Sequence, residues 1–420
     1  MQTTAVRLHG VNDLRVETFD LPEPREDEIL AEVITDSICM SSYKLSHLGE
    51  EHKRVRWPLS ERPIIIGHEF CGKILKVGSK WAHQFAPGMR FAIQPGLNYQ
   101  GTLWAPGYSY EHIGGDSTMV VIPNEVMEMD CLFEYKADES FTGSLSEPYS
   151  TVIGALKAQY HMEPGSYVHH MGIREGGTMA MLAGVGPMGL AALDVALHQD
   201  RRPRRIVVTD IAQDRLDRAA SLLTIEAAAA DGIELIYLNT DGLDDVRGTL
   251  VELNDGELYD DVFVFAPVRP VVELGSSLLG REGCLNFFAG PGNTDFEATI
   301  NFFDVHYSGH HYVATTGGNN EDIADALDLM AAGRLNPAIL VTHVGGLNVV
   351  PETTLNLPSI PGGKKLIYTQ KRLDLVAIAD FAERGKDDPL YAELARICEA
   401  NNGLWSKDAE DYLLEHAPGI

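Results

Sequence analysis

A buried strand, a glycine-rich turn and a helix follow one another between residues 178 and 198, and this order constrains the fold most. The apolar segment 178–183 (TMAMLA) predicts a strand, and 190–198 (LAALDVALH) predicts a helix. The turn between them has the GxGxxG pattern, which can hold a dinucleotide pyrophosphate. Its expected coenzyme contacts are Gly184, Gly186, Pro187, Met188 and Gly189. A strand–turn–helix unit that binds no nucleotide is the alternative.

An acidic residue follows at the position that a dinucleotide site requires. The segment 205–209 predicts a second strand, and Asp210 ends it about 20 residues after the turn, where a carboxylate binds the adenosine ribose. Such a carboxylate would repel a 2′-phosphate, so we expect NAD(H) to be favoured over NADP(H). Arg215 could offset that repulsion, which leaves NADP(H) possible.

Composition narrows the class of protein. The segment 178–197 is long enough to span a bilayer, but its glycines, Pro187 and Asp194 favour a buried strand, turn and helix. The first ten residues lack the apolar core of a signal peptide, and five cysteines without framework spacing suggest reduced thiols and a cytoplasmic location. The net charge of −28 argues against nucleic acid or an anionic membrane as partner.

The sequence predicts an α/β protein of two domains, one β-rich and one doubly wound. Residues 1 to about 125 alternate short β-rich segments with turn residues, which predicts an irregular β-rich domain. From 178 to 316 strands and helices alternate, which predicts a doubly wound parallel sheet. Segment 144–160 predicts a connecting helix, and the tail after residue 372 is helical. We expect a catalytic domain of 1–151 and 319–420, including that tail, and a Rossmann domain of 152–318.

Metal-binding side chains recur before the glycine turn. Cys39, His68, Glu69 and Glu147 offer a thiolate, an imidazole and two carboxylates, which suit an open tetrahedral zinc site. Each also has an ordinary interpretation: a buried thiol, a core histidine, or a carboxylate near a helix start. Glu69 would then be a buried charge without a partner, which costs several kcal/mol and which a metal would compensate.

The order of these motifs resembles the zinc-containing medium-chain dehydrogenases, above all the sorbitol dehydrogenase branch. The resemblance covers about residues 4–370. Further stretches resemble sugar-phosphate reductases of this kind: 39–44, 51–55, 107–111, 284–291, 361–368 and 378–383. The resemblance implies a GroES-like catalytic domain, onto which the end of the chain folds back, a Rossmann coenzyme domain, and a homodimer or homotetramer.

The resemblance also implies roles for individual residues. Cys39 and His68 would bind zinc, Glu69 would be a direct or exchanging ligand, and Glu147 would be the third protein ligand or bond the zinc-bound water. Ser41 would pass the alcohol proton toward the nicotinamide ribose. Lys44 would replace a histidine of the proton relay, although a surface charge or a coenzyme contact is an equal alternative.

Two departures from the family pattern stand out. Relatives carry four closely spaced cysteines for a structural zinc, but residues 94–116 contain none, so we expect one catalytic zinc and no structural zinc. Relatives also have an aspartate where Ser42 stands, which leaves the support of His68 open. The remaining cysteines, Cys71, Cys131, Cys284 and Cys398, are expected to be structural.

A basic segment interrupts this acidic chain. His52, Lys53, Arg54 and Arg56 lie between two zinc-ligand positions and could bind a substrate phosphate. A solvated basic loop is the alternative. The expected reaction is NAD(P)H-dependent reduction of a ketose phosphate, specifically L-sorbose 1-phosphate, to a hexitol phosphate. The alternatives are oxidation of a non-phosphorylated polyol or amino alcohol, and a non-catalytic nucleotide-binding regulatory protein.

Overall fold

The computed structural model describes residues 1–420, which form two compact units. The first unit comprises 1–147, 319–331 and 337–420, and the second comprises 148–318 and 332–336. Relative to the division expected from the sequence, the first boundary falls after Glu147 instead of residue 151, and 332–336 lie with the second unit.

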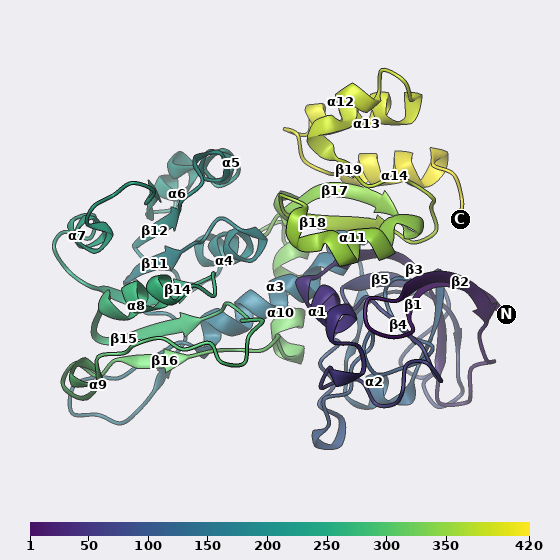
Figure 1. Ribbon diagram of the computed structural model, residues 1–420, viewed down its shortest axis with the longest axis horizontal. Coiled ribbons are helices and arrows are strands. Elements are labelled where there is room, and N and C mark those ends of the chain that lie inside the picture. Colours follow the sequence, from purple (N-terminus) through teal and green to yellow (C-terminus); the bar gives the residue numbers. More distant parts are fainter. The chain divides into compact units, whose positions relative to one another are not determined.

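The second unit is built on a six-stranded parallel sheet with the order β13-β12-β11-β14-β15-β16 (Figure 1). The order reverses direction at β11, which confirms the predicted doubly wound sheet. Its strands are β11 (Thr178–Leu182), β12 (Arg205–Asp210), β13 (Glu234–Asn239), β14 (Tyr259–Val264), β15 (Leu279–Phe287) and β16 (His311–Val313). Its helices are α4 (Pro187–His198), α5 (Gln213–Leu222), α6 (Ile225–Ala230), α7 (Val246–Glu252), α8 (Arg269–Ser277) and α9 (Phe302–Ser308).

The segment 178–197 forms strand β11, the glycine turn and helix α4, as predicted. Helix α4 begins at Pro187, earlier than the apolar pattern indicated, because proline suits the first helical position, whose amide has no intrahelical partner. No helix of this chain combines the length and the apolar character needed to cross a membrane.

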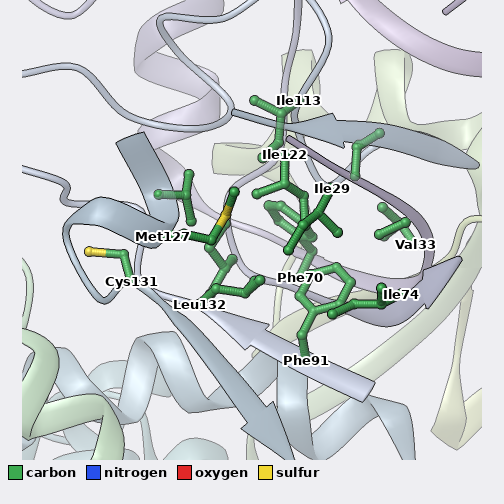
Figure 2. Close-up of a cluster of buried hydrophobic side chains, with 14 of the residues drawn as sticks. Ile29, Val33, Phe70, Ile74, Phe91, Ile113, Ile122, Met127, Cys131 and Leu132 are labelled. Atoms are coloured by element: carbon green, nitrogen blue, oxygen red, sulfur yellow. The ribbon is translucent and has the colours of Figure 1, made fainter. Parts of the chain in front are cut away.

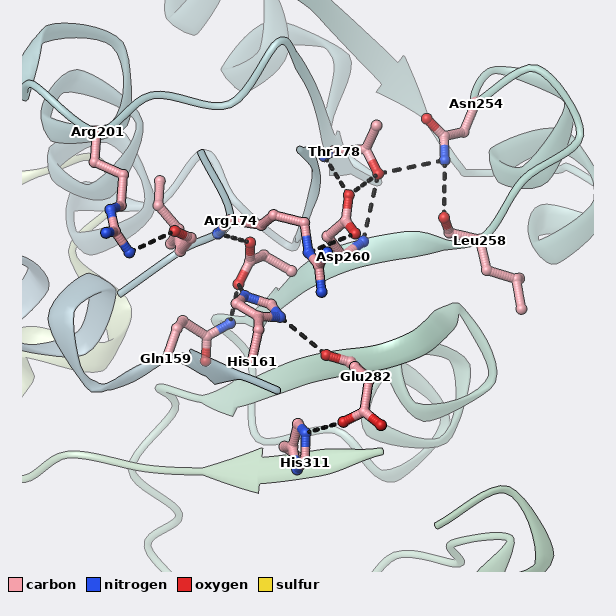
Figure 3. A network of polar contacts seen from close by, with 12 residues as sticks. Gln159, His161, Arg174, Thr178, Arg201, Asn254, Leu258, Asp260, Glu282 and His311 are labelled. Atoms are coloured by element: carbon pink, nitrogen blue, oxygen red, sulfur yellow. Dashed lines mark hydrogen bonds and ion pairs between the residues drawn. The ribbon is translucent and has the colours of Figure 1, made fainter. Parts of the chain in front are cut away.

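A polar network lies at the amino ends of the strands of this sheet, at the opposite end from the glycine turn (Figure 3). Gln159 donates to Asp261 at 2.9 Å, and the backbone amide of Thr178 donates to Asp260 at 2.8 Å. His161 contacts Asp261 at 3.1 Å from the short strand β9 (Tyr160–His161), which pairs with β10 (His170–Met171). Because these residues stand at the amino ends of parallel strands, the network lies away from the glycine turn and stabilises the sheet.

The first unit is β-rich, as predicted. An eight-stranded sheet has the order β19-β17-β18-β3-β5-β6-β8, with β7 paired to β3, and a smaller sheet has the order β2-β1-β4. The strands are β1 (Gln2–Leu8), β2 (Leu14–Asp20), β3 (Ile29–Ile38), β4 (Ile64–Ile65), β5 (Phe70–Val77), β6 (Arg90–Ile93), β7 (Met119–Ile122), β8 (Leu132–Tyr135), β17 (Val341–Gly346), β18 (Lys364–Tyr368) and β19 (Val376–Ala377). Figure 2 shows the core between these strands, where Phe70 and Phe91 pack edge to face.

Helices flank this sheet, and the tail adds three more beside β17 and β19 (Figure 1). The flanking helices are α1 (Met40–Leu48), α2 (Asn124–Glu128), α3 (Ser140–Ala158), α10 (Asn320–Ala331) and α11 (Val350–Asn356). The tail helices are α12 (Phe381–Arg384), α13 (Pro389–Ala400) and α14 (Lys407–His416). Helix α3 begins at Ser140, not at residue 144, and continues through Pro148. Glu147 therefore lies two turns inside the helix, and its interpretation as a dipole partner at a helix start is wrong.

Candidate metal and coenzyme sites

Cys39, His68 and Glu69 converge in the first unit, with their metal-ligating atoms all within 4.8 Å of one another. Cys39 lies between the end of β3 and the start of α1, while His68 and Glu69 directly precede β5. Strands β3 and β5 pair antiparallel, so the end of one meets the start of the other. The pairing of two strands thus brings together residues that are far apart in the sequence.

Gly67 allows the chain to turn into this site. Its φ is 88°, and a Cβ there would lie 2.6 Å from Asp36 Oδ2 and from the Asp116 amide nitrogen, so a side chain is excluded. Asp36 Oδ1 accepts the Glu69 amide at 3.0 Å, which orients the His68–Glu69 segment. Burial raises the pKa of Asp36 well above its usual range and that of Asp116 to about 7.

Glu69 has a cationic partner that the sequence analysis missed. Lys364 Nζ lies 2.5 Å from Glu69 Oε1 and 2.6 Å from Oε2, and the Ser37 hydroxyl also donates to this carboxylate. Burial alone would raise the pKa of Glu69, but the charges of Lys364 and His68 and the hydrogen bonds from Lys364 and Ser37 together lower it. The expectation that Glu69 lacks a partner without a metal is therefore wrong. The available signal was the pair of lysines that opens the segment 364–368 (KKLIY) before its apolar residues.

His68 and Cys39 face a common point. The Ser41 hydroxyl lies 3.0 Å from Cys39 Sγ and 3.1 Å from His68 Nε2, and the Tyr108 hydroxyl lies 3.4 Å from the same Nε2. Burial lowers the pKa of His68, which keeps the imidazole neutral as a metal ligand requires, and raises the pKa of the Cys39 thiol. A thiol, a neutral imidazole and a carboxylate around one point form a donor set that fits zinc.

Glu147 faces the same cluster from α3 but is not one of the three residues, Cys39, His68 and Glu69, whose ligating atoms lie within 4.8 Å of one another. It is 8% exposed, and burial raises its pKa to about 8, with a further contribution from the negative charge of Glu69. Glu147 also interacts electrostatically with His68 and Cys39. Lys44 lies about one turn beyond Ser41 in α1 and is half-buried.

The basic segment divides into residues with different surroundings. Lys53, Arg54 and Arg56 line a surface hollow of about 390 Å³ with Val55, Trp57, Leu103 and Trp104. The Arg56 guanidinium stacks on Trp104 at 3.6 Å from the ring centroid. Arg54 donates to the Leu103 carbonyl at 2.9 Å and lies over the Tyr108 ring, which also packs on His68.

His52 does not contribute the positive charge that the sequence analysis counted. Its ring stacks on Tyr108, with 5.4 Å between centroids. Burial, together with the positive charges of Arg54 and Lys53, lowers its pKa to about 4. His52 is therefore neutral at physiological pH, and the segment carries three cations instead of four.

In the second unit the glycine turn has the geometry of a dinucleotide site. A Cβ on Gly189 would lie 2.2 Å from the Gly184 carbonyl oxygen, so only glycine permits this close approach of helix and strand. Gly186, Pro187 and Met188 form the half-buried start of α4, where the backbone amides of a helix N-terminus can bind a phosphate.

Asp210 and Arg215 lie beside this turn. The Asp210 carboxylate is 5% exposed and accepts the amides of Ile211 and Ala212 at 2.9 and 3.1 Å. Arg215 Nη1 is 3.9 Å from Asp210 Oδ1, and its Nη2 is 3.4 Å from where a Cβ of Gly186 would lie. The residues expected at the coenzyme site are thus brought together at the carboxyl ends of β11 and β12.

Comparison with known proteins places the chain among characterised relatives. Residues 25–130 match the alcohol dehydrogenase GroES-like domain. The chain is 50% identical to L-sorbose 1-phosphate reductase of Klebsiella pneumoniae, over 100% of this chain and 98% of that protein. It is 47% identical to mannitol-1-phosphate 5-dehydrogenase of Aliivibrio fischeri, over 99% and 98% of the two chains. The crystal structure of 2R,3R-butanediol dehydrogenase from Bacillus subtilis has the same fold, with a TM-score of 0.70 and 21% identity over 87% and 99% of the two chains.

Proposed function

This chain belongs to the zinc-containing medium-chain alcohol and polyol dehydrogenases and is an oxidoreductase, and we propose that it interconverts a ketose phosphate and a hexitol phosphate with NAD(P)H. One observation carries the proposal: Arg54, a basic side chain of the hollow, lies over the same Tyr108 ring that packs on His68. A phosphate-binding group and a metal-binding cluster thus share one aromatic neighbour.

The metal site would be formed by Cys39 and His68 with a carboxylate from Glu69 or Glu147. A zinc ion bound there supplies a Lewis acid that polarises a carbonyl oxygen. We propose one such zinc per chain and no structural zinc. Lys364 holds Glu69 ionised and in place, so this carboxylate stays available next to the ligands.

Proton transfer would begin at Ser41. Its hydroxyl already contacts both Cys39 and His68, so it lies within reach of an oxygen bound between them. In reduction, Ser41 would donate a proton to the oxygen of the new alcohol, and a bound NAD(P)H would supply the hydride. The half-buried Lys44, one turn along α1, is the proposed next member of the relay or a coenzyme contact.

The coenzyme would bind at the turn 184–189, with its pyrophosphate on the amides at the start of α4. Asp210 would accept hydrogen bonds from the adenosine ribose, which favours NAD(H). Arg215 lies close enough to offset repulsion of a 2′-phosphate, so NADP(H) use is retained in the proposal as the weaker activity.

The relatives support two phosphorylated substrates. The 50% identical relative is a reductase of L-sorbose 1-phosphate, and the 47% identical relative is a mannitol-1-phosphate 5-dehydrogenase. We propose L-sorbose 1-phosphate first and mannitol 1-phosphate second, with the protein acting as a cytoplasmic homodimer or homotetramer.

The test is a substrate panel followed at the nicotinamide absorbance, with L-sorbose 1-phosphate, mannitol 1-phosphate and their dephosphorylated forms, combined with elemental analysis. A kcat/KM at least tenfold higher for a phosphorylated compound, with one zinc per active chain, supports the proposal. Preference for free polyols would favour a polyol dehydrogenase, and coenzyme binding without turnover of any compound would favour a regulatory protein.

A further inference from the structure

The C-terminal tail reaches the helix that carries Glu147 through one buried carboxylate. Glu410 in α14 is 1% exposed and accepts the backbone amides of Ser140 and Phe141, at 2.5 and 3.0 Å. These are the first two residues of α3, whose amides have no partner within the helix. A carboxylate also interacts favourably with the positive end of a helix dipole.

The same carboxylate holds the strand that carries Lys364. Tyr368 donates its hydroxyl hydrogen to Glu410 at 2.9 Å, and Trp405 donates to the Tyr368 oxygen at 2.7 Å. Tyr368 and Lys364 are four positions apart on β18, so both side chains project from the same face of the strand. Glu410 therefore bonds to both elements that carry Glu147 and Lys364.

The remaining contacts leave the first half of α3 little freedom. Thr35 donates to the Ser140 carbonyl at 3.0 Å. A Cβ on Gly143 would lie 2.6 Å from Cys71 Sγ, so the helix backbone lies directly on β5, just after His68 and Glu69. These contacts restrain α3 perpendicular to its axis. The bonds of Glu410 at the capped end then determine the position of the helix along its axis.

We propose that Glu410 is a positioning residue for the metal site, acting through α3 on Glu147, an inference that rests on the proposed function. Glu147 is two turns from the capped end, about 10 Å along the helix axis. A shift of α3 along its axis would move this carboxylate away from Cys39 and His68. The helical tail thus contributes to the metal site without touching it.

The experiment compares zinc affinity by competition with a chromophoric chelator, and the visible spectrum of the cobalt-substituted protein, across matched variants. Glu410→Gln keeps the shape but removes the charge, and Glu147→Gln supplies the reference change. Leu413→Ala is the control, because Leu413 is buried in the same tail helix and lacks the cap. We expect Glu410→Gln and Glu147→Gln each to weaken zinc binding about tenfold or more and to change the cobalt spectrum alike. Leu413→Ala should lower the melting temperature but keep zinc affinity within twofold.

Several results would overturn this role: wild-type zinc affinity in Glu410→Gln or in Glu147→Gln, or equal weakening in Leu413→Ala. Should Glu410→Gln fold poorly, Tyr368→Phe removes one bond to the same carboxylate and should show a smaller loss of the same kind. Failure of the proposed function is seen separately, as absence of zinc from the unmodified protein or absence of turnover with ketose phosphates.

Discussion

Lys364 and Glu69 form a buried ion pair with 2.5 Å between Nζ and Oε1, although 295 positions separate them in the chain. The lysine comes from β18, which pairs with β3 beside the candidate metal site. The charge of Glu69 is therefore compensated inside the protein itself, and this compensation can be tested independently of any metal.

Replacing the lysine should cost stability. Lys364→Met leaves Glu69 buried without its cation, which should lower the free energy of unfolding by about 3–5 kcal/mol. Urea unfolding of the metal-free protein measures this loss. The double variant Lys364→Met with Glu69→Gln should recover much of it, because the uncompensated charge is gone. A single variant as stable as the wild type would contradict the importance of the pair.

The two arginines of the basic segment should behave differently. Arg54→Ala should lower kcat/KM for the phosphorylated substrate by about 10- to 150-fold, the equivalent of a lost charge-assisted bond of roughly 1.5–3 kcal/mol, and spare the dephosphorylated form. Arg56→Ala is the matched control, since its guanidinium lies on Trp104 and not on the Tyr108 ring that packs on His68, and should change the ratio little. Equal losses for both substrates in Arg54→Ala would assign Arg54 a structural role instead.

The neutral state of His52 leads to a pH prediction. Its pKa is about 4 in the folded chain against 6.5 in the unfolded chain, so between these values only the unfolded chain takes up a proton. This group therefore reduces stability as the pH falls from 6.5 toward 4. In His52→Asn the fall in stability over that range should be shallower, as measured by urea unfolding. The KM for a phosphorylated substrate should follow the same pH profile in His52→Asn as in the wild type from pH 5.5 to 8, within twofold, whereas a different profile would mean that His52 binds the phosphate.

Coenzyme choice should depend on Asp210. Asp210→Ala removes the acceptor for the ribose hydroxyls and the repulsion of a 2′-phosphate, while Arg215 remains beside the site. We expect kcat/KM for NAD(H) to fall about tenfold and that for NADP(H) to rise. The double variant with Arg215→Ala should lose the gain with NADP(H). An unchanged ratio of the kcat/KM values for the two coenzymes would show that Asp210 does not bind the ribose.

Local patterns predicted much of this protein because they act over short distances. The strand–turn–helix at 178–198 and the strand predicted at 205–209 have the predicted type, since continuous apolar residues determine which backbone conformation buries them. The short helices α6 and α9 and the three-residue strand β16 escaped prediction because they carry too few residues for a periodic pattern.

The start of α3 shows a different limit of local reasoning. Residues 140–143 (SFTG) contain one apolar side chain and do not continue the apolar pattern, yet they are helical, and Glu410 caps them from the far end of the chain. Glu147 therefore lies inside α3 and not at its start, so it is not a carboxylate that stabilises the helix dipole.

By itself, the sequence determined the two units, the glycine turn with Asp210, and the residue types of a zinc site. Each of these depends on neighbouring residues or on a recognisable order of motifs. Only the tertiary structure decided which charges are paired and which side chains are free. Lys364 on Glu69, Glu410 on Ser140, the stacking of Arg56 and the neutral His52 depend on burial and on contacts between distant segments. Such contacts leave no local pattern, because folding brings the partners together and removes the water that would otherwise separate their charges.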